Sequence, residues 1–276
     1  MDTPTYISLY SGGGGLDIGF GLAMPSARAV CYVERELTCA ALLVDHMQTG
    51  QLDDAPLWSD ANTFEGKPWR GTVDWIIAGP PCQPFSQAGD KLAADDSRNG
   101  WPNTLRLVRE IEPRFCFFEN VASSEFLLYY WNDIKPGLQA MGYAVEEVLV
   151  KASDAGANHK RNRTFVLAYR EGEVVDTSGE GREGRRHSGP TRFGQSRPPS
   201  TVRDTEPFAF GPEDSRWEAL LIERPELAPA TESTIQRVAY GLARGLARND
   251  RLRILGNGVV PEQARLAMDA ILGAIK

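Results

Sequence analysis

The sequence predicts an α/β protein built on a mostly parallel, doubly wound, Rossmann-like sheet. Short apolar runs rich in Val, Ile, Phe and Tyr alternate with helix-length segments over residues 1–170. Each run is bounded by Gly, Pro or charged residues. The 276 residues are 42% hydrophobic and 9% aromatic, which is enough to bury a full core and excludes collagen, coiled coil and extensive disorder.

The elements follow from these runs in order. Six strands are expected, at Tyr6–Tyr10, Ala29–Glu34, Val73–Ala78, Arg114–Glu119, Ala144–Val150 and Thr164–Tyr169. Helices are expected at Glu36–Met47, at Thr104–Ile111, from about Glu232, and over Pro261–Ile275, where apolar residues recur at helical spacing. Because ligands of such sheets bind beyond the carboxyl ends of the strands, we expect the site in the loops that follow them.

The middle of the chain has a different composition. Residues 1–170 and 232–276 are expected to form one domain, and 171–231 a short, irregular segment between its two parts. Within it, Gly181–Arg203 has six Arg against one Glu, so it carries +5 while the remainder carries −12 of the total −7. The acidic total argues against a polyanionic partner, but this segment is either a solvated linker or a basic arm that contacts phosphate.

The cysteines and the N-terminus predict the cellular compartment. The four cysteines (Cys31, Cys39, Cys82 and Cys116) show no CxxC spacing, so neither a disulfide framework nor a metal site is expected. An acid stands near the N-terminus where a signal peptide would carry Lys or Arg, and no apolar run approaches the length of a membrane span. We therefore expect a soluble, cytoplasmic protein.

A glycine-rich loop follows the first strand directly. It reads Ser11-Gly12-Gly13-Gly14-Gly15-Leu16, and Glu34 ends the next strand about twenty residues on. Glycines there allow close approach of a ligand, and an acid at that distance can bind ribose hydroxyls. The order of strand, loop, helix, strand and acid favours an adenosine-type cofactor over a simple turn, with NAD and S-adenosylmethionine both open. Asp60 by itself indicates only a surface turn.

Two further strand ends carry reactive side chains. Cys82 lies in Gly79-Pro80-Pro81-Cys82-Gln83-Pro84, a loop that its prolines make rigid, so its thiol is placed as a nucleophile is. Cys31, Cys39 and Cys116 lie in apolar or helical stretches and are expected to be structural. Glu119 ends an apolar strand, where partial burial would raise the pKa of its carboxyl and let it donate a hydrogen bond near neutral pH.

Together these residues resemble the DNA (cytosine-5)-methyltransferase family. The resemblance covers about 1–170 and 232–276, and Gly79–Ser86 is its most specific block. The other matching blocks, in family order around it, are Leu9–Leu16, Glu34, Asp95–Asn99, Glu119–Val121, Lys160–Arg163 before a strand, and Gly256–Pro261.

The resemblance implies a catalytic role for four residues. Cys82 would attack C6 of a flipped-out cytosine in double-stranded DNA, and Glu119 would bind N3 and the exocyclic amine. Arg161 and Arg163 would lie near the pyrimidine O2 and the catalytic loop, where their charge would lower the pKa of the Cys82 thiol. The methyl group would come from S-adenosylmethionine, leaving S-adenosylhomocysteine.

The resemblance also implies which residues bind the cofactor and which contact DNA. The protein is expected to be a monomer that needs no protein partner. The cofactor residues would be Tyr10, Ser11, Gly12, Gly14, Gly15, Leu16, Glu34, Asp60, Pro80 and Asn257. The DNA contacts would be Gln83, Ser86, His159, Lys160, Arg182, Arg185 and Arg186.

Some positions depart from the family pattern. His159 stands where Gln is usual, Tyr10 where Phe is usual, and Gly258 where Ala is more usual. The main departure is the target-recognition region, which has only some sixty residues between Tyr169 and about Glu232 and would read few bases. Two alternatives stay open: a binding protein that has lost turnover, and a methyltransferase of RNA, although the Cys-Phe-Thr signature of the tRNA branch is missing.

Overall fold

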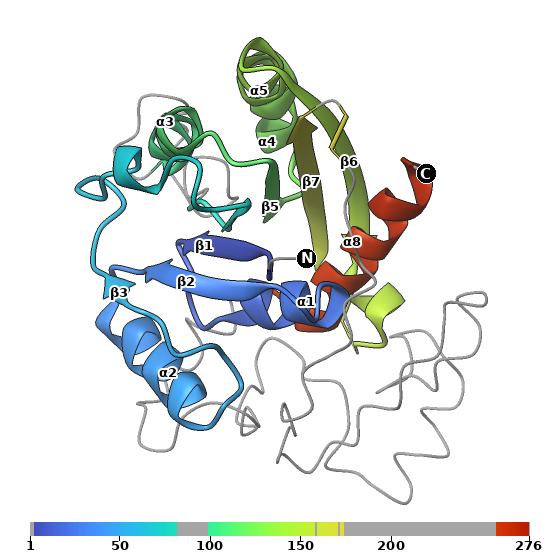
Figure 1. Ribbon diagram of the computed structural model, residues 1–276. Coiled ribbons are helices and arrows are strands. Elements are labelled where there is room, and N and C mark those ends of the chain that lie inside the picture. The colour runs from blue at the N-terminus through green and yellow to red at the C-terminus, as the bar shows by residue number, and fades with distance from the viewer. Residues whose placement is uncertain (1–2, 82–98, 158, 171, 174–257, 276) are drawn as a thin grey trace, which may run out of the picture.

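The computed structural model describes residues 3–81, 99–157, 159–170, 172–173 and 258–275. They form one seven-stranded sheet in the order β3-β2-β1-β4-β5-β7-β6, with helices on both of its faces (Figure 1). Strands β1 to β5 are parallel, and β7 runs antiparallel between β5 and β6. The predicted mostly parallel α/β sheet is therefore confirmed.

The bounds of the strands and helices fix which residues lie at the ends of the strands. The strands are β1 Thr5–Leu9, β2 Arg28–Val33, β3 Leu57–Trp58, β4 Trp75–Ala78, β5 Phe115–Val121, β6 Tyr143–Lys151 and β7 Asn162–Arg170. The α-helices are α1 Gly15–Ala23, α2 Leu37–Gln48, α3 Trp101–Ile111, α4 Ser124–Tyr129, α5 Lys135–Ala140 and α8 Pro261–Ala274. A π-helical turn, Tyr130–Ile134, joins α4 to α5, and short 3-10 turns lie at Lys67–Trp69 and Ala152–Ala155.

The core has two parts because successive strand residues point to opposite faces of the sheet. On one face, Ile76, Ala78 and Phe118 pack with residues of α3, α4 and α5. On the other, Ile77 and Phe117 pack with residues of α1 and α8. Burial of both faces explains why the central strands are continuous apolar runs rather than alternating ones.

Helices α1 and α8 lie side by side although they are far apart in the sequence (Figure 1). Their approach depends on Gly19, since a Cβ added there would clash with the Pro261 carbonyl and lie 2.7 Å from the Cβ of Ala264. The C-terminal helix α8 therefore packs directly against α1 on one face of the sheet.

Several predicted element bounds differ from the structure, and some elements were missed. The strand expected to end at Glu119 continues to Val121, because β7 pairs with it as far as Val121. Arg163 lies inside β7 rather than before it. The short β3 was missed, since two residues carry no detectable periodicity. The helix expected from about Glu232, and almost all of the segment 171–231, lie outside the described residues.

No helix in the described ranges is long and apolar enough to cross a membrane.

Candidate active site

A buried ion pair lies between β5 and β7. Nε of Arg163 is 2.6 Å from Oε1 of Glu119, and the two side chains are only 13% and 9% exposed. The antiparallel register places Arg163 opposite Val121, two residues beyond Glu119, so the two side chains are diagonal neighbours on adjacent strands. The antiparallel insertion of β7 thus gives the carboxylate its partner.

Glu119 has the electrostatic character expected of it. Burial raises the pKa of its carboxyl, while Arg163 and Arg161 act in the opposite direction and favour the charged form. Such a carboxyl can accept hydrogen bonds as a carboxylate, and burial makes it hold a proton more firmly than an exposed Glu does.

Arg161 approaches the same carboxyl from the start of β7. Burial, together with the neighbouring Arg163, lowers the pKa of its guanidinium to about 10, and Glu119 opposes that change. Its Nη2 donates a hydrogen bond to the carbonyl of Gly258. Its Nε is buried and has no hydrogen-bond partner among the residues described. Arg161 therefore links Gly258, just before α8, to the Glu119–Arg163 pair. Its Nε is left as a donor for a ligand.

The loop after β4 passes directly beside this pair. The backbone N–H of Gly79 donates to the Leu9 carbonyl at 3.4 Å, and Asn120 Nδ2 donates to the Pro80 carbonyl at 3.0 Å. A Cβ added at Gly79 would lie 3.5 Å from Oε2 of Glu119 and 3.9 Å from the Tyr10 carbonyl. Gly79 therefore lies between Glu119 and Tyr10, where an added methyl group would make ordinary contacts with both. The structure brings Gly79, Pro80 and Glu119 together. Cys82, Gln83 and Ser86 lie outside the described residues, so the predicted approach of Cys82 to Glu119 stays a prediction.

The glycine loop after β1 bends back toward β2. Tyr10, Gly12 and Gly14 all have positive φ, of 53°, 56° and 79°. The Gly12 N–H donates to Glu34 Oε2 at 2.7 Å, and the Glu36 N–H donates to Glu34 Oε1 at 2.7 Å. Glu34 is therefore oriented by backbone amides at the end of β2, and it faces the loop.

The C-terminal segment returns to this loop. A Cβ at Gly15 would clash with the Val259 carbonyl, so Gly15 allows the two backbones to touch. Leu16 is buried in the core beneath the loop, and the buried Ser11 hydroxyl donates to the Ser8 carbonyl at 3.1 Å. Asn257 lies outside the described residues, but its sequence neighbours Gly258 and Val259 reach both Arg161 and the glycine loop.

Tyr10 and Asp60 lie at the edge of the same region. The Tyr10 hydroxyl donates to the Gly100 carbonyl at 3.0 Å, and burial raises its pKa to about 12. Asp60 forms a turn, since its Oδ1 accepts from the backbone N–H of Asn62 at 2.9 Å and from Asn62 Nδ2 at 2.7 Å. A hydrogen bond of 2.6 Å from Asn103 to Asn62 then ties this turn to α3.

Among the expected DNA contacts, two are described. His159 and Lys160 are both exposed and directly precede Arg161. Arg182, Arg185 and Arg186 lie outside the described residues.

Comparison with known proteins identifies this arrangement. The family model for C-5 cytosine-specific DNA methylases matches residues 5–223, more than half of the chain. The chain belongs to this family.

Individual relatives agree with that assignment. The Type II methyltransferase M.NgoMIV of Neisseria gonorrhoeae is 29% identical over 60% of this chain and 52% of its own length. M.AquIA of Picosynechococcus sp. is 31% identical over 61% of this chain and 73% of its own. The Spodoptera frugiperda DNMT2 structure is similar in fold, with a TM-score of 0.51 at 20% identity over 64% of this chain and 53% of its own. The chain spans about half the length of several of the curated relatives it matches.

The sequence did not predict that Asp17, close to the glycine loop, is buried. Asp17, in the first turn of α1, is 1% exposed, and neither of its carboxylate oxygens has a hydrogen-bond partner within the described ranges. Burial raises its pKa to about 7. An acid in the first turn of a helix is usually a solvated capping residue, so the sequence carried no signal that this one is buried.

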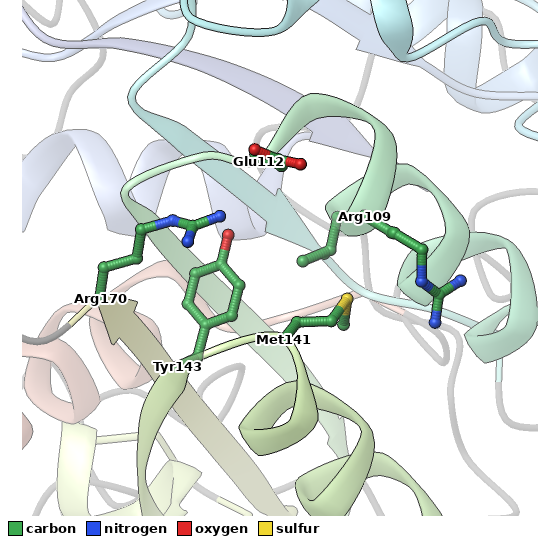
Figure 2. Close-up of a pocket in the computed structure, with 6 residues that line it drawn as sticks. Arg109, Glu112, Met141, Tyr143 and Arg170 are labelled. Atoms are coloured by element: carbon green, nitrogen blue, oxygen red, sulfur yellow. The ribbon is translucent and has the colours of Figure 1, made fainter.

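A cavity of about 260 Å³ lies at the opposite end of the sheet, by the start of β6 and the end of β7 (Figure 2). Three of its polar lining residues have partners. The Tyr143 hydroxyl donates to the Pro113 carbonyl at 2.6 Å, and the Arg170 guanidinium lies 4.9 Å from the centre of the Tyr143 ring. Glu112 pairs with Arg70 at 3.0 Å. This cavity is separate from the Glu119 site.

Proposed function

We propose that the protein is a DNA (cytosine-5)-methyltransferase that transfers a methyl group from S-adenosylmethionine to C5 of cytosine in double-stranded DNA. The observation that carries the proposal is the buried Glu119–Arg163 pair directly beside the Gly79-Pro80-Pro81 loop that leads to Cys82. Membership of the C-5 cytosine-specific methylase family supports it.

The chemistry explains why these residue types are needed. C5 of cytosine is a poor nucleophile until the conjugation of the ring is broken. In the proposed reaction the Cys82 thiolate forms a bond to C6, and the electrons of the C5–C6 double bond move into the ring as N3 is protonated. Glu119 holds N3 and the exocyclic amine, while Arg161 and Arg163 keep the carboxyl in place and favour the thiolate.

The remaining steps restore the ring. C5 would take the methyl group as the bond from that group to the cofactor sulfur breaks, which would leave S-adenosylhomocysteine. C5 would then carry both a methyl group and a proton. Loss of that proton and of the N3 proton, with breakage of the bond between sulfur and C6, releases 5-methylcytosine and regenerates the thiolate. A stacked base cannot reach a carboxyl that is 9% exposed, so the proposal requires the cytosine to be flipped out of the duplex.

The residues of the glycine loop fit the proposed cofactor. When bound, S-adenosylmethionine supplies an electrophilic methyl group. Glu34 would bind the ribose hydroxyls, and the loop from Tyr10 to Leu16 would pack against the cofactor with Asp60, Pro80 and Asn257. The positive φ at Gly12 and Gly14 and the alignment of Glu34 by backbone amides support this assignment.

DNA binding is proposed for the exposed pair His159 and Lys160, for Gln83 and Ser86, and for the basic segment that contains Arg182, Arg185 and Arg186. The logarithm of the DNA-binding constant should fall linearly with the logarithm of the salt concentration. Replacing those three arginines by Ala should reduce the steepness of this slope by about 2 to 3. Fluorescence anisotropy with a labelled duplex at several salt concentrations measures it, and an unchanged slope assigns the segment to a solvated linker.

The function is tested by methyl transfer and by trapping of the intermediate. Purified protein with tritiated S-adenosylmethionine should label duplex DNA, the C82A variant should not, and C39A, which removes a half-exposed thiol from α2, should label it as the wild type does. A duplex containing 5-fluorocytosine should form a complex with wild type that survives denaturation, because fluorine cannot leave C5 as a proton does.

Two results would contradict the proposal. Normal labelling by C82A would exclude the covalent mechanism, and labelling of tRNA in preference to duplex DNA would assign the substrate to RNA. Binding of duplex DNA with no labelling by the wild type would favour the alternative of a binding protein that lacks turnover.

A further inference from the structure

We propose that Gln263 of α8 is a positioning residue that holds Arg161 in place for the methyl-transfer reaction. The inference rests on the proposed function, because it gives Gln263 its role through an arginine of the proposed cytosine pocket.

The contacts of Gln263 are unusual for a helix residue. Its side chain is completely buried, and its Nε2 donates two hydrogen bonds, to the Arg161 carbonyl at 2.9 Å and to the Val150 carbonyl at 2.7 Å. Both acceptors lie where β6 ends and β7 begins. A primary amide has two N–H donors, so Gln263 uses all of its donor capacity to join α8 to the backbone of this hairpin.

Arg161 is fixed from the same segment a second time. Its guanidinium donates to the carbonyl of Gly258, five residues before Gln263. The backbone and the side chain of Arg161 are therefore both held by residues 258–263. Two residues further along β7, Arg163 pairs with Glu119. A shift of Arg161 would displace positive charge from beside that carboxyl and would move the strand that carries Arg163.

The energetics favour a positional role over simple packing. Oε1 of Gln263 is buried and has no hydrogen-bond partner in the described part of the chain, which costs free energy that an apolar side chain at this site would avoid. The neighbouring buried residues of α8, Ala264, Ala267 and Met268, are apolar. An amide at this one position is explained by the two carbonyls that it holds.

The same segment also contacts the cofactor side of the site. The Val259 carbonyl lies against Gly15 of the glycine loop. Residues 258–263 therefore contact the glycine loop through Val259 and Arg161 through Gly258 and Gln263. Gln263 anchors this segment to the end of β6 and the start of β7.

The test uses the full-length protein and two buried residues of α8. Q263M keeps the size of the side chain and removes both donors, while M268A disturbs α8 without touching Arg161. Measured below both melting temperatures, Q263M should lower the rate of methyl transfer about tenfold, as the loss of buried hydrogen bonds at a site implies, and M268A should leave it within about twofold. In an R161A background, Q263M should add nothing further.

A pH profile adds a readout that general loosening of α8 would not change. If Arg161 moves away from Glu119, the Glu119 carboxyl loses a charge that favours its ionised form, so the pH profile of Q263M should shift to higher pH. If Q263M does not fold, Q263N, whose shorter amide reaches at most one of the two carbonyls, takes its place and should give an intermediate loss. Additive effects of Q263M and R161A, or equal losses in Q263M and M268A, would overturn the inference.

Hydrogen exchange separates this inference from the proposed function. Peptides that cover residues 152–163 should exchange faster in Q263M than in wild type or M268A, whether or not the protein transfers methyl groups. If the wild type is inactive, the proposed function fails and hydrogen exchange still decides whether Gln263 holds Arg161. Unchanged exchange in Q263M would reject the positioning role.

Discussion

The two sides of the site hold their acids in different ways. On the side of β5 and β7, Glu119 is buried against the permanent charge of Arg163, at 2.6 Å. On the side of β1 and β2, Glu34 is only half-buried and accepts hydrogen bonds from two backbone amides. The first arrangement fixes a charge before any ligand arrives, and the second aligns a carboxylate that still faces solvent. We interpret the first as suited to chemistry on a base and the second to binding a sugar.

Asp17 completes the comparison. It is as deeply buried as Glu119, but no cation opposes the effect of burial on its carboxyl, whose pKa rises to about 7. The two buried acids, Asp17 on α1 and Glu119 on β5, therefore differ in whether an arginine of the described residues accompanies them. Four substitutions test that difference, in order of expected effect.

The largest effect is expected for E119Q, which keeps the shape of the side chain and removes its ability to share a proton. Loss of a catalytic acid should lower kcat about 10³-fold, or about 4 kcal/mol in activation free energy. The protein should still fold and bind cofactor. Single-turnover labelling of duplex DNA measures the effect, with E146Q, on the exposed side of β6, as the control. A loss below tenfold would mean that the base is held by other groups.

The second-largest effect is expected on the free energy of unfolding, from removal of the Arg163 charge. R163M leaves the Glu119 carboxyl buried without its partner, which should destabilise the fold by about 3 kcal/mol at pH 8. Because the folded-state pKa of Glu119 is then raised further above its unfolded value, stability decreases as pH rises through that pKa, so the loss should be smaller at pH 5. Urea unfolding at both pH values measures it.

The double variant R163M/E119Q is the control for this prediction. It removes the buried charge together with its partner and should recover most of the stability lost in R163M. If R163M is equally destabilised at pH 5 and pH 8, the loss comes from packing and not from the charge of Glu119.

The residues of the two sides of the site show what could be predicted from the sequence and what could not. The positions of Glu34 and Glu119 near strand ends, the glycine loop and the helix after Pro261 followed from local pattern, because β propensity, turn residues and helical spacing are local properties. The contact of Arg163 with Glu119 depends on β7 running antiparallel beside β5, and nothing in either strand encodes that pairing. The contacts of Arg161 with Gly258 and Gln263 span about a hundred residues and likewise arise only from the packing of α8 on the sheet.

Asp17 gives the third prediction. Its folded pKa of about 7 lies above the ordinary value of 3.8, so the folded protein loses stability as pH rises from about 4 to about 7 and carries the full cost above that. The rise of about three pKa units corresponds to about 4 kcal/mol between pH 4 and pH 8, and the buried amide of D17N has a cost of its own. D17N should therefore be more stable than wild type by about 2 kcal/mol at pH 8 and less stable by about 2 kcal/mol near pH 4. Thermal unfolding from pH 4 to pH 8 measures it, with exposed D133N as the control. A constant difference at every pH would show that Asp17 does not titrate in this range.

The smallest effect is expected on the cofactor side, where backbone amides and not arginines hold the acid. E34Q keeps one oxygen for the Gly12 or Glu36 amide but loses the charge and one acceptor, so ribose binding weakens while the chemistry at the base is untouched. KM for S-adenosylmethionine should rise about tenfold, or about 1.4 kcal/mol, at unchanged kcat. E36Q, two residues on and exposed, should leave both constants near wild type. A fall in kcat at unchanged KM would place Glu34 among the groups that act on the reacting atoms, and the contrast between the two sides of the site would then be wrong.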